Sequence, residues 1–304
     1  MSGIVLILSI VLSILTDAAY ALIVGTLLAG RWLAALETSG LSTSPSLFSK
    51  PSQRRFLMQF TLVLIAAHLM RPWFLAASMS GSTGFQENLT LIPTILSSTH
   101  QGTVWYWNSA ALLALFIASY FSTLTAWLAP VSVFMLAFAK AASGHAAGQG
   151  DFTLIESLQA THILSTAIWS GTILFSGLYL LRRVADQRNP YAVWHYCASL
   201  SKTATYAVFA VLLSGIYTSD KQLNNTLVGL TSNIWGKVLI TKIVFVLVAL
   251  TLGAITRFRY LRAQPSPIGT THVLRLLSLE AMAMVVILCL SGVLGNNAPP
   301  MAAM

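Results

Sequence analysis

The sequence predicts an all-α integral membrane protein, a bundle of about eight transmembrane helices. Of the 304 residues, 56% are hydrophobic and only 8% are charged, whereas a soluble domain carries about a quarter charged residues. Such a chain cannot cover a water-facing surface, so lipid must cover it. Several apolar runs also reach the roughly 20 residues that a helix needs to cross a hydrocarbon core of ~30 Å. We expect one polytopic domain over residues 1–304.

Eight segments meet this length requirement. Ser122 and Thr123 alone separate the third from the fourth, which predicts a tight connection. Between the second and third segments, residues 81–102 leave room for a short surface helix at about 89–99. The predicted spans are 4–30, 56–79, 103–121, 123–142, 154–181, 193–217, 235–257 and 273–295.

The first apolar run is interpreted as a retained helix. Ala19, Tyr20 and Ala21 imitate a small-residue cleavage site, but no Lys or Arg precedes Arg31 and the apolar run continues past these residues. A cleaved signal peptide has a positive start and a short apolar region.

Basic residues are distributed unequally between the two sets of loops. An even number of spans places both termini on one side, and loops rich in Lys and Arg stay in the cytoplasm. We therefore expect both termini to face outward, into the periplasm, with the protein in the bacterial inner membrane. The predicted inner loops hold Arg31, Lys50, Arg54, Arg55, Arg182, Arg183, Arg188, Arg257, Arg259 and Arg262, with Arg275 just beyond, against Arg71, Lys140, Lys221 and Lys237 near the outer helix ends.

Ionisable residues inside the spans are candidate functional sites, because a charge in hydrocarbon costs at least about 2 to 3 kcal/mol. Asp17 lies on a polar stripe of the first span with Ser9, Ser13 and Tyr20. Two interpretations are open for Asp17. It is either a carboxylate on a cation path or a buried Asp neutralised by a neighbouring Lys or Arg.

The fifth span carries the clearest polar face. His162 shares this face with Gln159, Thr166, Trp169 and Ser170. The preceding outward loop, 143–151, contains His145 among three glycines, so its backbone can approach a ligand closely. A lone His can also join two helices or lie in a turn by chance. The shared polar face favours a functional role for His162, and His145 in the loop is a candidate metal ligand at the outer mouth.

Further candidates lie on other spans. Glu156 is near the outer mouth of the fifth span, and Lys242 in the seventh is either its counter-ion or a side chain that extends to the surface. Glu280 and Met284 share a face of the eighth span, and His100 lies near the outer surface. Nine Met and six His with few carboxylates suit copper better than Mg²⁺ or Ca²⁺, although Met is also a packing residue.

Several function classes lack their motifs in this chain. There is no H-E-x-x-H, no G-x-S-x-G, no phosphate-binding loop and no C-x-x-C, so nothing predicts hydrolysis or ATP use, and we expect no enzyme. The net charge of +9 arises from scattered residues, which do not form a nucleic-acid patch. Cys197 and Cys289 lie on different spans and are not expected to pair.

A series of short motifs follows in a characteristic order. Gly144, His145 and Ala146 precede His162 and the segment 168–171, and these are followed by Ser214 and Gly215. The segments 98–102, 235–242, 274–280 and 298–300 complete the series. Together they resemble the copper resistance protein D (CopD) family, most strongly over about 99–300. The family often has Asn-Arg after the seventh span, where this chain has Ile255, Thr256 and Arg257.

The resemblance implies eight spans and copper uptake across the inner membrane, with a separate periplasmic CopC-like carrier as partner. It also implies His145 and His162 as copper ligands. We expect copper to enter through these residues, with help from His100, and to pass along faces that bear Asp17, Glu156, Glu280 and Met284. Two alternatives stay open. One is a b-type cytochrome with haem held between His68 and His162, and the other is a copper-delivery or assembly factor that transports nothing.

Overall fold

The computed structural model describes residues 3–40, 50–144, 152–180, 190–223 and 233–297. Within these ranges the secondary structure is entirely helical. The helices are α1 (Gly3–Thr38), α2 (Lys50–Ser80), α3 (Phe85–Ser98), α4 (His100–Tyr120), α5 (Ser122–Thr125), α6 (Leu128–Ala142), α7 (Leu154–Phe175), η2 (Ser176–Leu180), α9 (Pro190–Leu223), α11 (Ile234–Ile255), η3 (Thr256–Tyr260) and α12 (Pro267–Gly295).

Five of the described helices are long and apolar enough to cross a membrane. They cover Gly3–Thr38, Pro51–Ser80, Tyr191–Thr218, Ile234–Tyr260 and Pro267–Gly295. The protein is therefore an all-helical membrane protein, as the composition predicts. The helices α4 and α7 have 21 and 22 residues, which is span length, but they carry more polar side chains. The helix α6 has only 15 residues, so the eight-span count stays a prediction.

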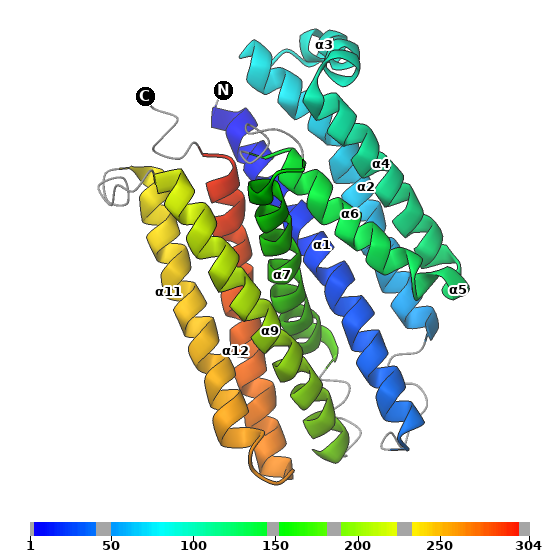
Figure 1. Cartoon of the computed structure of the whole chain (residues 1–304), viewed down its shortest axis with the longest axis vertical. Coiled ribbons are helices and arrows are strands. Elements are labelled where there is room, and N and C mark those ends of the chain that lie inside the picture. Colours follow the sequence, from blue (N-terminus) through cyan, green and yellow to red (C-terminus); the bar gives the residue numbers. More distant parts are fainter. Residues whose placement is uncertain (1–2, 41–49, 145–151, 181–189, 224–232, 298–304) are drawn as a thin grey trace.

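The long helices run along one common direction (Figure 1). The start of α1 and the end of α12 lie at the same end of the bundle, where Asn296 Nδ2 donates to Ser13 Oγ at 2.9 Å. We call this the terminal end. The end of α1 and the η3 segment lie at the opposite end, which we call the arginine-rich end because it holds Arg31 and Arg259.

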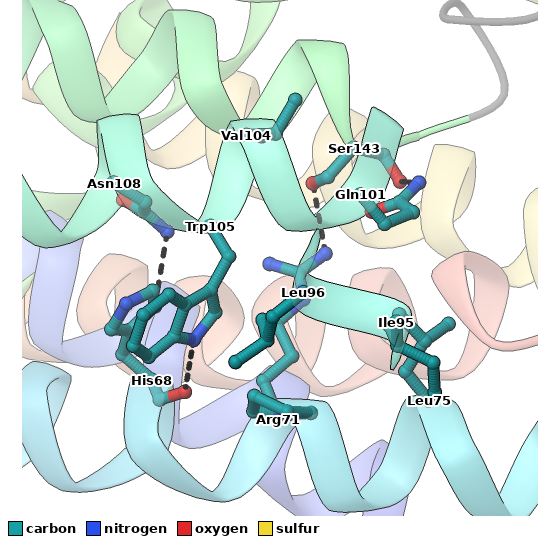
Figure 2. Close-up of a pocket in the computed structure, with 11 residues that line it drawn as sticks. His68, Arg71, Leu75, Ile95, Leu96, Gln101, Val104, Trp105, Asn108 and Ser143 are labelled. Carbon is teal, nitrogen blue, oxygen red and sulfur yellow. Dashed lines mark hydrogen bonds between the residues drawn. The ribbon is translucent and has the colours of Figure 1, made fainter. Parts of the chain in front are cut away.

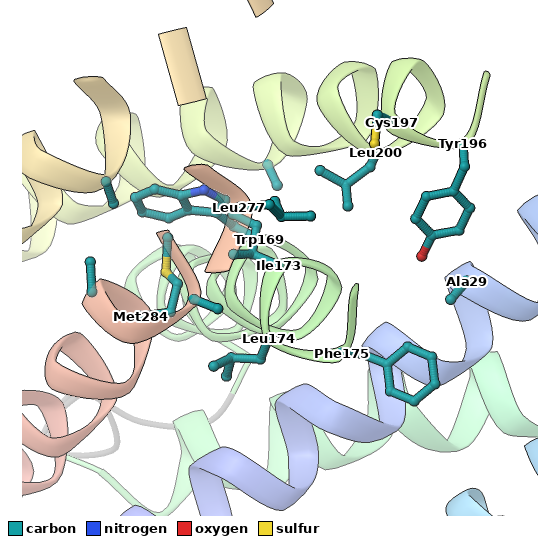
Figure 3. Packing of buried hydrophobic residues seen from close by; sticks show 14 of the residues in the cluster. Ala29, Trp169, Ile173, Leu174, Phe175, Tyr196, Cys197, Leu200, Leu277 and Met284 are labelled. Atoms are coloured by element: carbon teal, nitrogen blue, oxygen red, sulfur yellow. The ribbon is translucent and has the colours of Figure 1, made fainter. Parts of the chain in front are cut away.

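Two apolar cores share the helices α1 and α7. One core joins them to α9, α11 and α12, and includes Trp169, Phe175, Tyr196 and Met284 (Figure 3). The other joins them to α2, α4 and α6. The bundle thus has two halves, and α1 and α7 form the seam between them.

Glycines allow α1 and α7 to pack backbone against backbone. A Cβ atom on Gly171 would collide with the Ala21 carbonyl, and one on Gly25 would collide with the Gly171 carbonyl. Ala21 and Gly25 lie four residues apart on α1, as do Ala167 and Gly171 on α7. Small residues at this spacing are typical of close helix contacts in membranes.

The link between the predicted third and fourth spans differs from the expected two-residue connection. Phe121 adopts an extended conformation and ends α4, the short helix α5 follows, and α6 begins only at Leu128. Thr125 Oγ1 donates to the Ala118 carbonyl at 2.6 Å and closes this turn. The predicted surface helix is confirmed as α3, which begins four residues earlier than expected and ends where Thr99 caps α4.

Candidate functional site

His162 lies on α7 and faces α9. Its Nδ1 atom is 3.0 Å from Ser214 Oγ, and the Ser214 hydroxyl lies 2.5 Å from the Ala210 carbonyl oxygen. A hydroxyl has one proton, and the carbonyl accepts it. Nδ1 must therefore carry the imidazole proton and donate to Ser214. In this tautomer Nε2 carries the lone pair that could bind a metal ion, and the Val211 backbone of α9 is a further hydrogen-bond partner of the ring.

A glycine next to Ser214 lets the ring approach the α9 backbone. A Cβ atom on Gly215 would lie 3.2 Å from His162 Cε1, which is tighter than an ordinary carbon–carbon contact. The two neighbours therefore have different tasks. Ser214 sets the proton position of the ring, and Gly215 makes room for it.

One charged side chain acts on this ring directly, and two more are linked to it in series. Lys242 of α11 interacts electrostatically with both His162 and Lys140 of α6. Lys140 forms an ion pair with Asp17 of α1. The Asp17 carboxylate therefore has a cationic partner in this structure. This agrees with the interpretation of Asp17 as a buried carboxylate neutralised by a neighbouring Lys or Arg. The positive charge of Lys242 opposes strong binding of a cation at His162.

Glu156 is buried at the start of α7, where its hydrogen bonds stabilise the first turn. Glu156 Oε2 accepts a hydrogen bond from the Phe152 backbone N–H at 2.5 Å. The Thr153 hydroxyl accepts from the Glu156 backbone N–H at 3.3 Å. These two hydrogen bonds together resemble a capping box. Phe152, just before the helix, has a positive φ of 57°. The carboxylate thus has a structural task at this helix end.

Glu280 and Met284 lie one turn apart on α12, inside the half of the bundle that contains His162. A Cβ atom on Gly253 of α11 would lie 3.2 Å from Glu280 Oε1, so the carboxylate packs against a glycine. Met284 is fully buried in the same core as Trp169 of α7, and Figure 3 shows the two side chains next to each other. These two residues of the predicted path therefore lie among α7, α11 and α12.

The predicted outer ligands are not assembled with His162 in the described part of the chain. His145 lies outside the described residues. His100 begins α4, and its Nε2 atom is 3.1 Å from the Ala142 carbonyl oxygen. Within the described ranges, no three His, Cys, Asp or Glu side chains are grouped so that they could hold a metal ion. A preformed multidentate cage is therefore absent from these ranges.

His68 contrasts with His162. Its Nε2 atom is 2.8 Å from Ser109 Oγ, and that hydroxyl donates to the Trp105 carbonyl, so Nε2 carries the proton. Asn108 Nδ2 lies 3.5 Å from Nδ1, and the ring stacks on Trp105 with centroids 4.7 Å apart. Both nitrogens of His68 therefore have partners on α4, whereas His162 contacts α9. The His68 ring on α2 faces α4 and the His162 ring on α7 faces α9, so the two rings do not face each other.

Comparison with known proteins gives two family matches. The model "Copper resistance protein D-like, N-terminal domain" matches residues 4–154, and "Copper resistance protein D" matches residues 194–294. Most of α7, with His162, falls between the two matched segments.

One curated protein is similar to this chain. Copper transport protein CutJ of Bacillus subtilis (strain 168) is 29% identical over 199 residues, which is 63% of this chain and 36% of that protein. The match thus spans about a third of the relative's length. No solved structure matches the chain.

Proposed function

Because the chain belongs to the copper resistance protein D family, we propose that it imports copper, or handles it in transit, at the bacterial inner membrane. The observation that carries this proposal is the state of His162. Its Nδ1 donates to Ser214, so Nε2 is ready to bind a metal ion. Metal-ligating histidines regularly donate their other N–H to a fixed partner in this way.

One imidazole beside one lysine makes a weak site, and weak binding suits transport. An ion on a conduction route must bind well enough to enter and loosely enough to leave. Lys242, near His162, keeps the affinity low. We propose His145, in the loop directly before α7, as the second ligand, with His100 in a lesser role. Two imidazoles are a common ligand set for copper.

The inner half of the proposed route runs along α12. Met284 offers a soft thioether to Cu(I), and Glu280 offers a carboxylate one turn away. Asp17 and Glu156 border the route at the outer half, each with a partner of its own. Copper is the cargo of this route, and no resident cofactor is part of the proposal.

The proposed topology has eight spans with both termini in the periplasm. It is supported by the position of the α1 start and the α12 end at one end of the bundle, and of the arginines at the other. Under the positive-inside rule the arginine-rich end is cytoplasmic. Copper then arrives at the terminal end, delivered by a separate CopC-like carrier, and the chain acts as one transport domain without enzymatic chemistry.

Copper uptake into proteoliposomes tests this proposal. His162→Ala should abolish uptake, and Ser214→Ala should weaken copper binding about tenfold or more, because the ring loses its orienting partner. His68→Asn is the matched control, since His68 is also buried in a helix but has both nitrogens bonded. Its uptake should stay normal.

Two outcomes would contradict the import mechanism. Normal uptake by His162→Ala would remove the assigned site. Copper bound to the protein without any uptake would instead indicate a delivery or assembly factor. An absorbance spectrum of the same preparation tests the haem alternative, because haem held by two histidines gives a strong Soret band.

A further inference from the structure

A polar cavity opens in the other half of the bundle, between α2, α3, α4 and the end of α6 (Figure 2). Its polar wall contains Arg71, Gln101, Trp105, Asn108 and Ser143. Because α4 begins and α6 ends here, the cavity lies at the terminal end. It belongs to the half of the bundle with α2 and α4, whereas His162 faces α9 of the other half.

Arg71 is the only charged residue that lines this cavity within the described chain, and no Asp or Glu is among its lining residues. The side chain extends from α2 toward Ser143, where Nη2 donates to the hydroxyl oxygen at 2.8 Å (Figure 2). A guanidinium has five N–H donors, and this bond uses one. The cavity therefore holds a permanent positive charge with donors to spare.

Hydrogen bonds hold the rest of the wall in place. Gln101 Nε2 donates to the Ser143 carbonyl at 3.2 Å, which joins α4 to the end of α6. Trp105 Nε1 donates to the His68 carbonyl at 3.3 Å, which joins α4 to α2. His68 contacts Ser109 through Nε2 and Asn108 through Nδ1, both on α4. The wall thus supplies a fixed frame, and Arg71 supplies the charge.

We propose that this cavity binds a phosphate-type oxyanion through Arg71. The planar guanidinium matches the oxygens of a phosphate and can bind two of them at once. Leu75, Ile95 and Leu96 form an apolar wall beside it, which suits a group attached to the phosphate. The positive charge of Arg71 disfavours a copper cation in this cavity.

A phospholipid headgroup and free inorganic phosphate share this chemistry, and the test separates them. Purified, delipidated protein in a neutral detergent receives either inorganic phosphate or a short-chain phosphatidylglycerol. Chloride at equal ionic strength and a diacylglycerol with the same chains are the references. The melting temperature should rise with one or both phosphate compounds and with neither reference. A rise with the lipid alone assigns the site to a headgroup, and a rise with both assigns it to the oxyanion itself.

Substitutions locate the effect. Arg71→Gln should abolish the rise, whereas Arg31→Gln should preserve it. Arg31 is a matched control, because it also donates one hydrogen bond, to the Ala126 carbonyl, but lies at the other end of the bundle. If Arg71→Gln does not fold, Arg71→Lys keeps the charge without the planar fork and should weaken binding about tenfold.

The proposal is overturned if neither phosphate compound stabilises the unchanged protein. It is also overturned if Arg71→Gln and Arg31→Gln show the same rise in melting temperature. The same holds if Arg71→Lys responds like the unchanged protein. His162→Ala should leave this response unaltered, since the two sites lie in different halves of the bundle.

Discussion

The contact between α1 and α7 makes a quantitative prediction at Gly171. In Gly171→Ala the new Cβ atom would meet the Ala21 carbonyl, far inside the ~3.3 Å that carbon and oxygen normally keep. The obstacle is backbone, so no rotamer change relieves the collision and the helices must separate. Overpacking of this kind costs about 1–3 kcal/mol, more than the up to ~1 kcal/mol that Ala gains over Gly within a helix.

The assay is thermal unfolding in detergent at one fixed heating rate. For a chain of this size, each kcal/mol moves the midpoint by roughly 2 °C, so Gly171→Ala should unfold several degrees lower. Gly253→Ala is the matched control inside another helix. The three atoms nearest its Cβ all belong to the Glu280 carboxylate, with Oε1 at 3.2 Å, and this flexible group can move by a few tenths of an ångström. Equal midpoints for the two variants would refute the packing argument.

Four further predictions follow from the charged side chains and the topology. Lys140→Met should destabilise the protein by about 1–3 kcal/mol in chemical unfolding, because Asp17 loses its partner. Adding Asp17→Asn should restore most of that loss. Equal stability of the single and double variants would contradict the ion pair's role. Glu156→Gln should lower the unfolding free energy by about 1 kcal/mol, because its bond to the Phe152 N–H weakens. Copper uptake should persist, because the Gln amide keeps an oxygen beside the route; loss of uptake would show that transport needs the charge of Glu156. Lys242→Gln should tighten Cu(I) binding about tenfold in a competition titration, since a nearby positive charge is removed; weaker binding would contradict this electrostatic argument. A cysteine added after Met304 should react with a membrane-impermeant thiol reagent in intact spheroplasts, because the proposed topology places the C-terminus outside. Reaction only after lysis would place the C-terminus in the cytoplasm.

Sequence patterns predict the long helices well because each depends on local properties alone. Length and apolarity over about 20 residues define a span, and the predicted starts of the seventh and eighth spans fall on α11 and α12. The link near Ser122 was predicted wrongly. Hydropathy averages over a window and does not register the extended conformation of Phe121 that ends α4.

Contacts between helices could not be predicted from one sequence. Asp17 and its partner Lys140 are 123 residues apart, and His162 and Ser214 are 52 apart. Both members of each pair are visible as polar residues in apolar spans. Which of them meet depends on how the helices pack, and the glycines at the α1–α7 seam help to decide that.

The two buried histidines show why this packing determines chemistry. His68 and His162 have the same side chain in similar apolar helices, and each meets a serine of a neighbouring helix. Ser109 faces Nε2 of His68, and Asn108 faces Nδ1, so that ring is bonded on both edges. Ser214 faces Nδ1 of His162 and leaves Nε2 as the ligand atom. Asn108 precedes the serine that faces His68, whereas Gly215 follows the serine that faces His162. This difference separates a structural histidine from a candidate copper ligand.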